Sequence, residues 1–203
     1  MSLFRKLFGP SKPDHSKEEL QSDERGKYMP EVKLPLDERF TINFKANGGK
    51  FLYCENLNEI YQNLQHILEE NHWENQNALI VDDNLADKFK NSNLRPTKNT
   101  DSCAFFLTTC ENLIADDGSL LISSKQIFEK KLPELPVTFV VFATTSQMVD
   151  TIGEGLKGIK AKNKKNIPTN ITTIKHFKSN TDKDFLSYGS STKNLYLLLL
   201  EDL

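Results

Sequence analysis

The chain has 203 residues, of which 27% are charged and 37% are hydrophobic, and its formal net charge is −2. This length suits one domain with its own core, because a folded chain of this size buries roughly 70% of the surface that it exposes when unfolded. The near-neutral charge excludes a general polyanion binder, whose domain is usually strongly basic, so no nucleic-acid partner is expected.

The cysteines and histidines of the chain form no recognisable metal or redox motif. Three cysteines, at positions 54, 103 and 110, are odd in number and lack Cys-x-x-Cys spacing, so neither a disulfide framework nor an iron–sulfur site is expected. The longest apolar run, 195–200, is far shorter than the ~20 residues of a membrane helix. We therefore expect a cytoplasmic protein that has no membrane segment, metal or cofactor.

The first part of the chain, residues 1–35, is predicted to be a flexible charged tail. Prolines and charges of both signs recur there, with few apolar side chains between them. Ordering such a segment costs more conformational entropy than its burial returns. A single folded domain is expected over residues 36–203.

A helix is predicted over about 57–71. Apolar residues recur there every four positions, at Ile60, Leu64 and Leu68. Asn56 is a suitable N-cap, and Glu59 stands three residues later, where it can complete a capping box. A short strand, 51–54, is expected just before this helix.

Further strands are predicted wherever short apolar runs recur. The runs are 78–81, 103–107, 120–122, 137–143, 171–174 and 195–200. Several are continuous rather than alternating, as expected of strands covered on both faces in a mostly parallel sheet. After the fourth run, residues 144–147 resemble a helix cap, and apolar residues continue at helical spacing from Met148 to Ile159. This succession indicates an α/β fold in which helices flank the sheet.

One β-hairpin insertion interrupts this alternation, at Asp116, Asp117, Gly118 and Ser119. An Asp-Gly pair between two apolar runs favours a tight turn, because glycine reaches positive φ without strain. We predict a ligand loop here, whose backbone N–H groups suit an anion and whose carboxylates suit a hydroxyl, an amine or a metal. The alternative is a solvated turn.

From this hairpin onwards the sequence resembles the LUD (lactate-utilisation) domain family. The family's hairpin reads apolar-Ala-acid-Thr-Gly-Thr/Ser, and Asp117 stands here in place of the threonine. Leu135 and Pro136 then lead into a strand and a helix, as in the family. Upstream, Gly48 and Gly49 resemble the glycine pair between the family's first helix and first strand.

A later family segment, Gly-Pro-Ser-x-Thr-x-Asp, is only partly present. Its Ser-x-Thr core stands at Ser179 and Thr181, whereas Phe177 and Lys178 replace the Gly-Pro pair. The family's His-Gly-Pro turn before the last strand also lacks its histidine, because Tyr188 precedes the glycine.

The resemblance covers about 40–200 and implies a fold like that of the glucosamine-phosphate isomerase, ribose-phosphate isomerase and CoA-transferase group. It implies an accessory subunit in the oxidation of L-lactate to pyruvate, working beside iron–sulfur oxidoreductase subunits. A small anionic or carboxylate ligand is expected. The residues expected to bind this ligand are Gly48, Gly49, Asp116, Asp117, Gly118, Ser119, Ser179 and Thr181.

Three features leave other functions open. Glu111 ends a buried strand and could act as a general base, which would suit an independent enzyme acting on a phosphorylated or acyl substrate; it could equally be a helix-terminal acid. Residues 144–146 could bind an anion or simply cap a helix. The segment 157–178 has seven lysines and no acid, which suits a regulatory or scaffold module or a solvated helix end.

Overall fold

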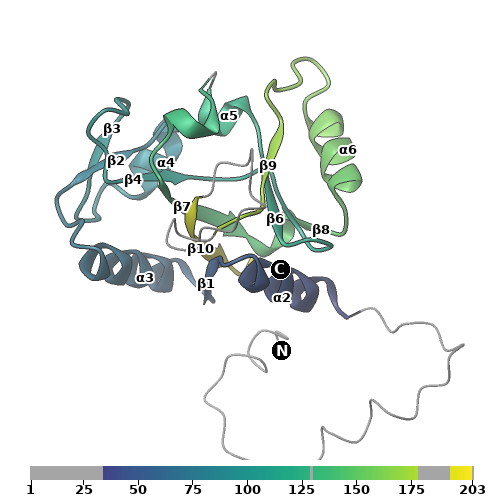
Figure 1. The fold of residues 1–203 in the computed structure, drawn as a ribbon, viewed down its shortest axis with the longest axis horizontal. Helices are drawn as coiled ribbons and strands as arrows, with labels where there is room; N and C mark the ends of the chain where they lie inside the picture. Colours follow the sequence, from purple (N-terminus) through teal and green to yellow (C-terminus); the bar gives the residue numbers. More distant parts are fainter. Residues whose placement is uncertain (1–33, 129, 178–192, 203) are drawn as a thin grey trace, which may run out of the picture. The chain divides into compact units, whose positions relative to one another are not determined.

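A parallel sheet forms the centre of the molecule in the computed structural model, which describes residues 34–128, 130–177 and 193–202 (Figure 1). The sheet has six strands in the order β1-β10-β7-β4-β2-β3. The strands are β1 (Lys50–Cys54), β2 (Asn77–Leu79), β3 (Arg95–Thr97), β4 (Phe105–Thr108), β7 (Thr138–Thr144) and β10 (Asn194–Leu200). All of their pairings are parallel, which confirms the predicted α/β class.

The two longest strands, β7 and β10, are continuous apolar runs because both of their faces are covered. Alternate side chains of each strand point to opposite faces, yet nearly all of them are buried. One face packs against α3 (Leu57–Glu70) and α4 (Asp83–Lys88) through a single apolar cluster. The predicted stripe Ile60, Leu64 and Leu68 of α3 is fully buried in it.

The predicted cap of α3 is present in a modified form. The side chain of Asn56 accepts a hydrogen bond from the backbone N–H of Glu59. The carboxylate of Glu59 accepts in return from the backbone N–H of Glu55 rather than from that of Asn56. This pair satisfies one donor of the first turn, the N–H of Glu59, and also the N–H of Glu55, the residue before the N-cap.

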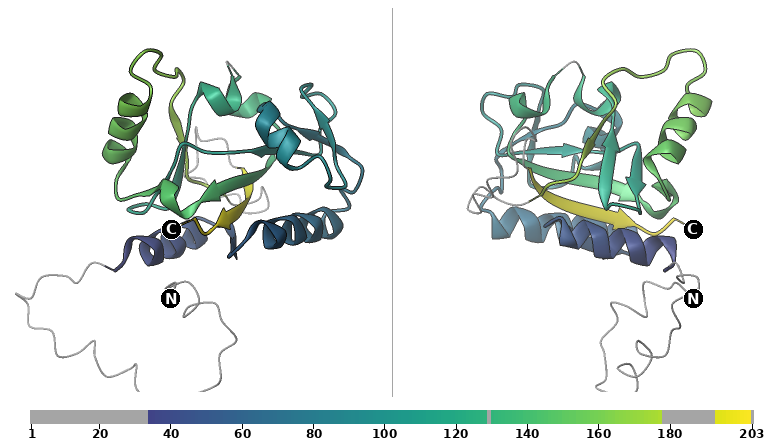
Figure 2. Two further views of the ribbon diagram at one scale, coloured as in Figure 1. Left: turned by 180° about the vertical axis from the view of Figure 1, so that it is seen from behind. Right: turned by 45° about the vertical axis from the view of Figure 1, so that its right-hand side comes forward.

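The predicted hairpin is confirmed, and it belongs to a second sheet rather than to the central one. Strands β5 (Asn112–Ile114) and β6 (Ser119–Ile122) pair antiparallel, and the second sheet has the order β8-β5-β6-β9. Its other members are β8 (Met148–Val149) and β9 (Thr172–Ile174). Helix α6 (Ile152–Lys162) lies beside this sheet, where Ile159 packs on Ile114 and Leu121 (Figures 1 and 2).

The predicted start of the helix after β7 is wrong by several residues. Met148 and Val149 form β8, which pairs parallel with β5, and the helix begins only at Ile152. Thr151 is the N-cap, because its side chain accepts from the backbone N–H of Glu154. Residues 145–147 form a separate 3-10 turn, η2 (Thr145–Gln147).

Helix α2 (Leu36–Ala46) precedes the first strand and covers a further part of the core. Its aromatic residues Phe40 and Phe44 lie four positions apart and are fully buried. The ring of Phe44 lies 6.4 Å from that of Phe51 in β1 and 4.9 Å from that of Phe177. The remaining short elements are α5 (Ser124–Ile127) and the 3-10 turn η1 (Leu132–Glu134). Along the described chain, no helix is both long and apolar enough to cross a membrane.

Candidate functional site

The turn of the β5–β6 hairpin lies against helix α2, which presents a polar side to it. The amide of Asn43 donates to the backbone carbonyl oxygens of Ala115 and Asp116 at 2.8 and 3.1 Å. Directly after the last residue of α2, the amide of Asn47 donates to the carbonyl oxygen of Asp117 at 2.7 Å. The carbonyl groups of this turn are therefore satisfied by α2 rather than left open to a ligand.

Gly118 is required in this turn for two separate reasons. Its φ of +67° lies in the left-handed region that favours glycine. A Cβ atom at this position would also stand 2.3 Å from the backbone nitrogen of Phe44 and 2.4 Å from the carbonyl carbon of Asn43. The turn can therefore approach α2 closely only because residue 118 has no side chain.

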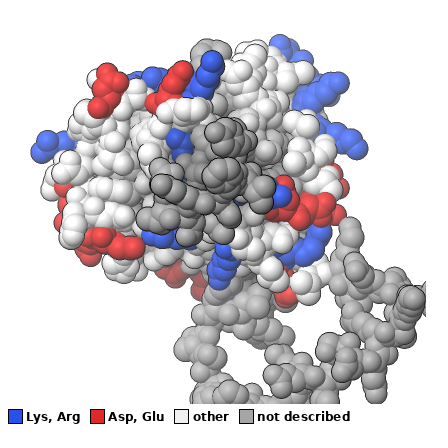
Figure 3. All heavy atoms as spheres, in the orientation of Figure 1, with Lys and Arg blue, Asp and Glu red and all other residues white. Residues whose placement is uncertain are grey.

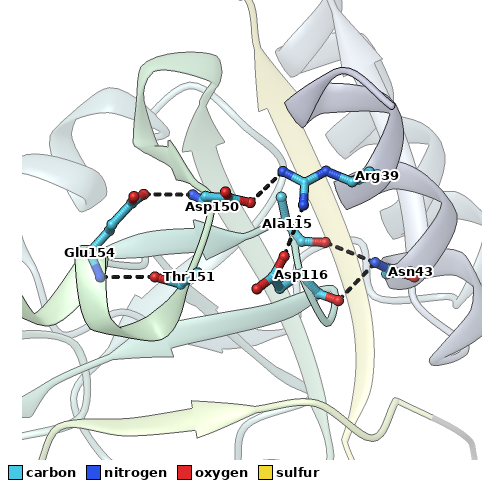
Figure 4. Close-up of polar contacts among 7 residues, drawn as sticks. All are labelled: Arg39, Asn43, Ala115, Asp116, Asp150, Thr151 and Glu154. Atoms are coloured by element: carbon cyan, nitrogen blue, oxygen red, sulfur yellow. Dashed lines mark hydrogen bonds and ion pairs between the residues drawn. The ribbon is translucent and has the colours of Figure 1, made fainter. Parts of the chain in front are cut away.

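Arg39 of α2 joins the turn to the loop before α6, as Figure 4 shows. Its guanidinium pairs with Asp116 at 2.8 Å and also with Asp150. The hydrogen bond to Asp150 is the main cause that raises the pKa of Arg39. Asp150 in turn donates its backbone N–H to Glu154 of α6. One arginine thus links a helix, a hairpin turn and the start of a second helix.

The exposure of this cluster differs between the cation and its carboxylates. The side chain of Arg39 is 17% exposed, whereas those of Asp116 and Asp150 are 48% and 32% exposed. The Nε atom of Arg39 is buried and has no hydrogen-bond partner. The carboxylates therefore face the solvent, and the arginine lies behind them.

Asp117, the residue that stands in place of the family's threonine, is held within the turn itself. Its Oδ1 atom accepts from the backbone N–H and the hydroxyl of Ser119 at 3.1 and 2.6 Å. Its Oδ2 atom lies 3.6 Å from the ammonium group of Lys175, just beyond β9. Two cations, Arg39 and Lys175, therefore flank the acidic turn.

The predicted glycine pair forms the connection between α2 and β1. Gly48 has a φ of +89°, and its backbone N–H donates to the carbonyl oxygen of Lys45. A Cβ atom on Gly49 would lie 2.3 Å from the ring of Phe44. Both glycines thus have a structural reason to be present, and their role in ligand binding stays a prediction.

Glu111 lies at the other end of β5 from Asp116. Its carboxylate accepts from the hydroxyl of Ser123 at 2.7 Å, and Ser123 is fully buried as the N-cap of α5. A strand rises about 3.3 Å per residue, so the two acids lie roughly 10–16 Å apart along the chain. They cannot act together on one substrate atom, since proton transfer needs contact at hydrogen-bond distance.

A hydrogen-bonded cluster of polar groups connects the residues that follow the carboxyl ends of β7 and β10. Asp202 accepts hydrogen bonds from the hydroxyl of Thr145, the backbone N–H of Ser146 and the hydroxyl of Ser146, at 2.9, 2.9 and 2.7 Å. Residues 144–146, for which the sequence left anion binding or capping open, do both: Thr144 is the N-cap of η2, and Thr145 and Ser146 bind a carboxylate of the same chain. Desolvation alone would raise the pKa of Asp202, but the hydrogen bonds from Ser146, and then from Thr144 and Thr145, lower it.

Two functional groups were missed at the sequence level. Arg39 has a detectable signal, because Arg39 and Asn43 stand four residues apart and so share one side of α2, and Asn47 directly follows that helix. Lys193 has none: it is buried just before β10, where its ammonium group donates to the carbonyl oxygens of Leu135 and Pro136. Burial lowers the pKa of Lys193 to about 8.

Two of the residues predicted to bind a ligand, Ser179 and Thr181, lie outside the described residues. Of the others, Asp116, Asp117, Gly118 and Ser119 come together at the α2 side of the hairpin, and Glu111 does not join them. The described ranges contain no group of three histidine, cysteine or acidic residues that could hold a metal ion. The arrangement can present one accessible cation, Lys175, and the carboxylates of Asp116 and Asp117 to a small polar ligand.

Comparison with known proteins relates the chain to one family. The LUD domain family model matches residues 38–200. A solved structure of a DUF162 family protein from Deinococcus radiodurans is similar, with a TM-score of 0.57 and 11% sequence identity, over 82% of this chain and 96% of that one. At this identity the likeness shows a shared fold. None of the curated proteins matches the chain.

Proposed function

The chain belongs to the LUD domain family, and from this premise we propose that it is an accessory, ligand-binding subunit in lactate utilisation. In this proposal it works beside iron–sulfur oxidoreductase subunits that oxidise L-lactate to pyruvate. The observation that carries the proposal is the family match over residues 38–200, nearly all of the folded part. The side chains of the hairpin are consistent with an accessory rather than a catalytic role, because each of its described acids already has a partner. Asp116 binds Arg39, and Asp117 binds Ser119.

The ligand proposed for this subunit is a small carboxylate, of the size of lactate or pyruvate. Lys175 is the more accessible of the two cations beside the hairpin, since its side chain is 44% exposed. A ligand carboxylate would compete with Asp117 for this ammonium group at 3.6 Å, a weak pairing that is easily exchanged. Ser179 and Thr181 are proposed, on the family resemblance, to donate hydroxyl hydrogen bonds to the same ligand.

The ligand proposal is tested by calorimetric titration of the full chain with L-lactate and pyruvate. Replacing Ser179 and Thr181 together with alanine is expected to weaken binding at least roughly tenfold, because two hydrogen bonds to a charged group are lost. Thr100→Ala with Ser102→Ala is the matched control, since it removes two hydroxyls whose hydrogen-bond partners are Lys130 and Asn77 rather than residues of the hairpin. Equal binding by both double variants would contradict the proposed site.

The cellular role is tested separately, by deleting the gene and measuring growth with L-lactate as the sole carbon source. Growth is expected to fail and to return with the intact gene. A second measurement is co-purification of iron–sulfur subunits with the tagged chain. Unimpaired growth of the deletion strain, with no such subunits recovered, would refute the accessory role.

An independent enzyme that uses Glu111 as its base is the alternative function, and one contact favours it. The carboxylate of Glu111 binds the hydroxyl of Ser123 at 2.7 Å, which is the geometry of a base beside an alcohol. However, Ser123 is fully buried and caps α5, so a substrate would have to displace that cap. If Glu111→Gln abolished a measured turnover while the fold was retained, the enzymatic function would be preferred.

A further inference from the structure

A group of lysines gathers at the α6 side of the molecule, and we call this group the lysine face. Figure 3 shows Lys and Arg side chains concentrated where Figure 1 places α6. The face consists of Lys125, Lys157, Lys160, Lys162, Lys164 and Lys165, all of which are exposed. The ion pairs found among the described residues use other cations, so this face carries charge that is not neutralised within them.

The loop that carries two of these lysines is held in place by hydrogen bonds. The backbone N–H of Ser124 donates to the carbonyl oxygen of Thr169, and that of Thr169 donates to the hydroxyl of Ser124. Lys125 donates to the side chain of Asn163 at 2.6 Å, and Asn163 donates back to the last turn of α6 at 2.8 Å. The lysines are thus presented from an ordered support, which reduces the entropy lost when a partner binds.

Apolar side chains of α6 lie next to these charges. Ile159 is buried against the second sheet, whereas Ile152 and Leu156 of the same helix are 37% and 41% exposed. On a helix, Lys160 stands four residues after Leu156 and so shares its side. The surface therefore combines uncompensated ammonium groups with two partly exposed aliphatic side chains.

We propose that the lysine face is a docking surface for a partner protein that presents an acidic segment with interspersed aliphatic side chains. Charge complementarity selects the acidic residues, and Ile152 and Leu156 select the aliphatic ones. The six residues of the lysine face include no arginine, the side chain that most often reads bases in nucleic-acid surfaces. Helix α6 also has only 11 residues, with part of its apolar side already packed, which leaves little to insert into a membrane.

The test uses a short synthetic peptide that repeats leucine followed by glutamate pairs, with binding measured by fluorescence anisotropy. The intact chain is expected to bind it at low salt and to lose this binding at roughly 0.5 M salt, where the Debye length is below about 5 Å. Replacing the peptide's leucines with serine is expected to weaken binding several-fold. This inference does not depend on the lactate role, so either can fail without the other.

Two charge-reversal variants, one in the lysine face and one elsewhere, test whether the peptide binds at the lysine face. Lys160→Glu, Lys164→Glu and Lys165→Glu together are expected to weaken peptide binding at least tenfold, as for the loss of several surface pairs. The matched control reverses three exposed cations between α4 and β4, namely Lys90, Arg95 and Lys98, and so changes the net charge equally. The variant of the lysine face should unfold at the wild-type urea concentration, and the control should lose only the exposed Lys98–Asp83 pair, whose contribution to stability is small.

Three outcomes would overturn the proposal. One is equal weakening by both variants, which would mean that only net charge matters. Another is unchanged binding in the variant of the lysine face. The third is tighter, lysine-dependent binding of phosphatidylserine vesicles or duplex DNA than of the peptide, which would assign the surface to a membrane or to nucleic acid.

Discussion

Replacing Gly118 with alanine should undock the hairpin from helix α2 and destabilise the fold. An alanine at a φ of +67° costs about 1–2 kcal/mol on its own. Its Cβ atom would also stand 2.3 Å from the backbone of Phe44, so the turn must move away from the helix. That movement breaks the three hydrogen bonds from Asn43 and Asn47, each worth about 1 kcal/mol net. The expected loss of unfolding free energy is about 4–5 kcal/mol.

The assay is urea unfolding followed by circular dichroism, with Gly158→Ala as the matched control. Gly158 lies inside α6, and a Cβ atom there would have no neighbour within 4 Å. Alanine is the better helix former, so this variant should gain roughly 0.5–1 kcal/mol. Two substitutions of the same chemistry are thus expected to shift the midpoint in opposite directions. A Gly118→Ala midpoint within experimental error of the wild type would refute the close approach described here.

Three further outcomes follow from the titratable groups. Asp202→Asn should lower the unfolding free energy at neutral pH, because the lowered pKa of Asp202 favours the folded state at pH values above the ordinary aspartate pKa of 3.8. The difference between variant and wild type should disappear as the pH falls below 3.8 through the lowered pKa. Urea midpoints measured from pH 7 to pH 2 will check it. The pKa of Lys193 is about 8 in the folded state against an ordinary 10.5, so the unfolded state binds more protons between pH 8 and 10.5. The wild type should therefore gain stability relative to Lys193→Met as the pH rises through this window. A stability difference that does not change with pH would contradict the burial of the amine. Cys103 should be the fast-reacting thiol in native labelling, because it is partly exposed whereas Cys54 and Cys110 are buried. Burial raises the thiol pKa of all three, that of Cys54 to about 11. Mass spectrometry of the labelled chain will show the order, which should vanish in urea.

The elements that could be predicted are those whose residues carry their own signal. The run 195–200 and the run 137–143 are continuous apolar segments, and both form central strands of the parallel sheet. The hairpin was predictable because Gly118 supplies a positive φ between two apolar runs. In each case local chemistry and tertiary packing favour the same structure.

The elements that were missed depend on partners distant in sequence. Met148 and Val149 fit the apolar spacing of the following helix, yet pairing with β5 makes them a strand. Strand β3 contains Arg95 and Pro96 and has no apolar run, which is possible because it lies at the edge of the sheet. Short strands of this kind are determined by the sheet to which they are added rather than by their own residues.

The candidate site shows the same division. The turn at Asp116 and Asp117 was found from its sequence, but its contacts with α2 were not, because Arg39 and Asn47 lie some 70 positions earlier in the chain. The sequence therefore suggested a loop open to ligands, whereas the structure shows a turn whose carbonyl groups are largely engaged by a helix. Lys193 gave no signal at all, since a buried amine is recognised only from what covers it.

The position of β10 in the central sheet has a consequence for how this protein is made. Strand β1 pairs only with β10 among the described strands, and the paired residues Lys50 and Tyr196 are 146 positions apart. At about 5–20 residues per second, a ribosome needs roughly 7–30 s to travel from one to the other. Throughout that interval β1 is a nascent strand with an unsatisfied edge. The β1 side of the sheet therefore cannot be completed before β10 has been synthesised.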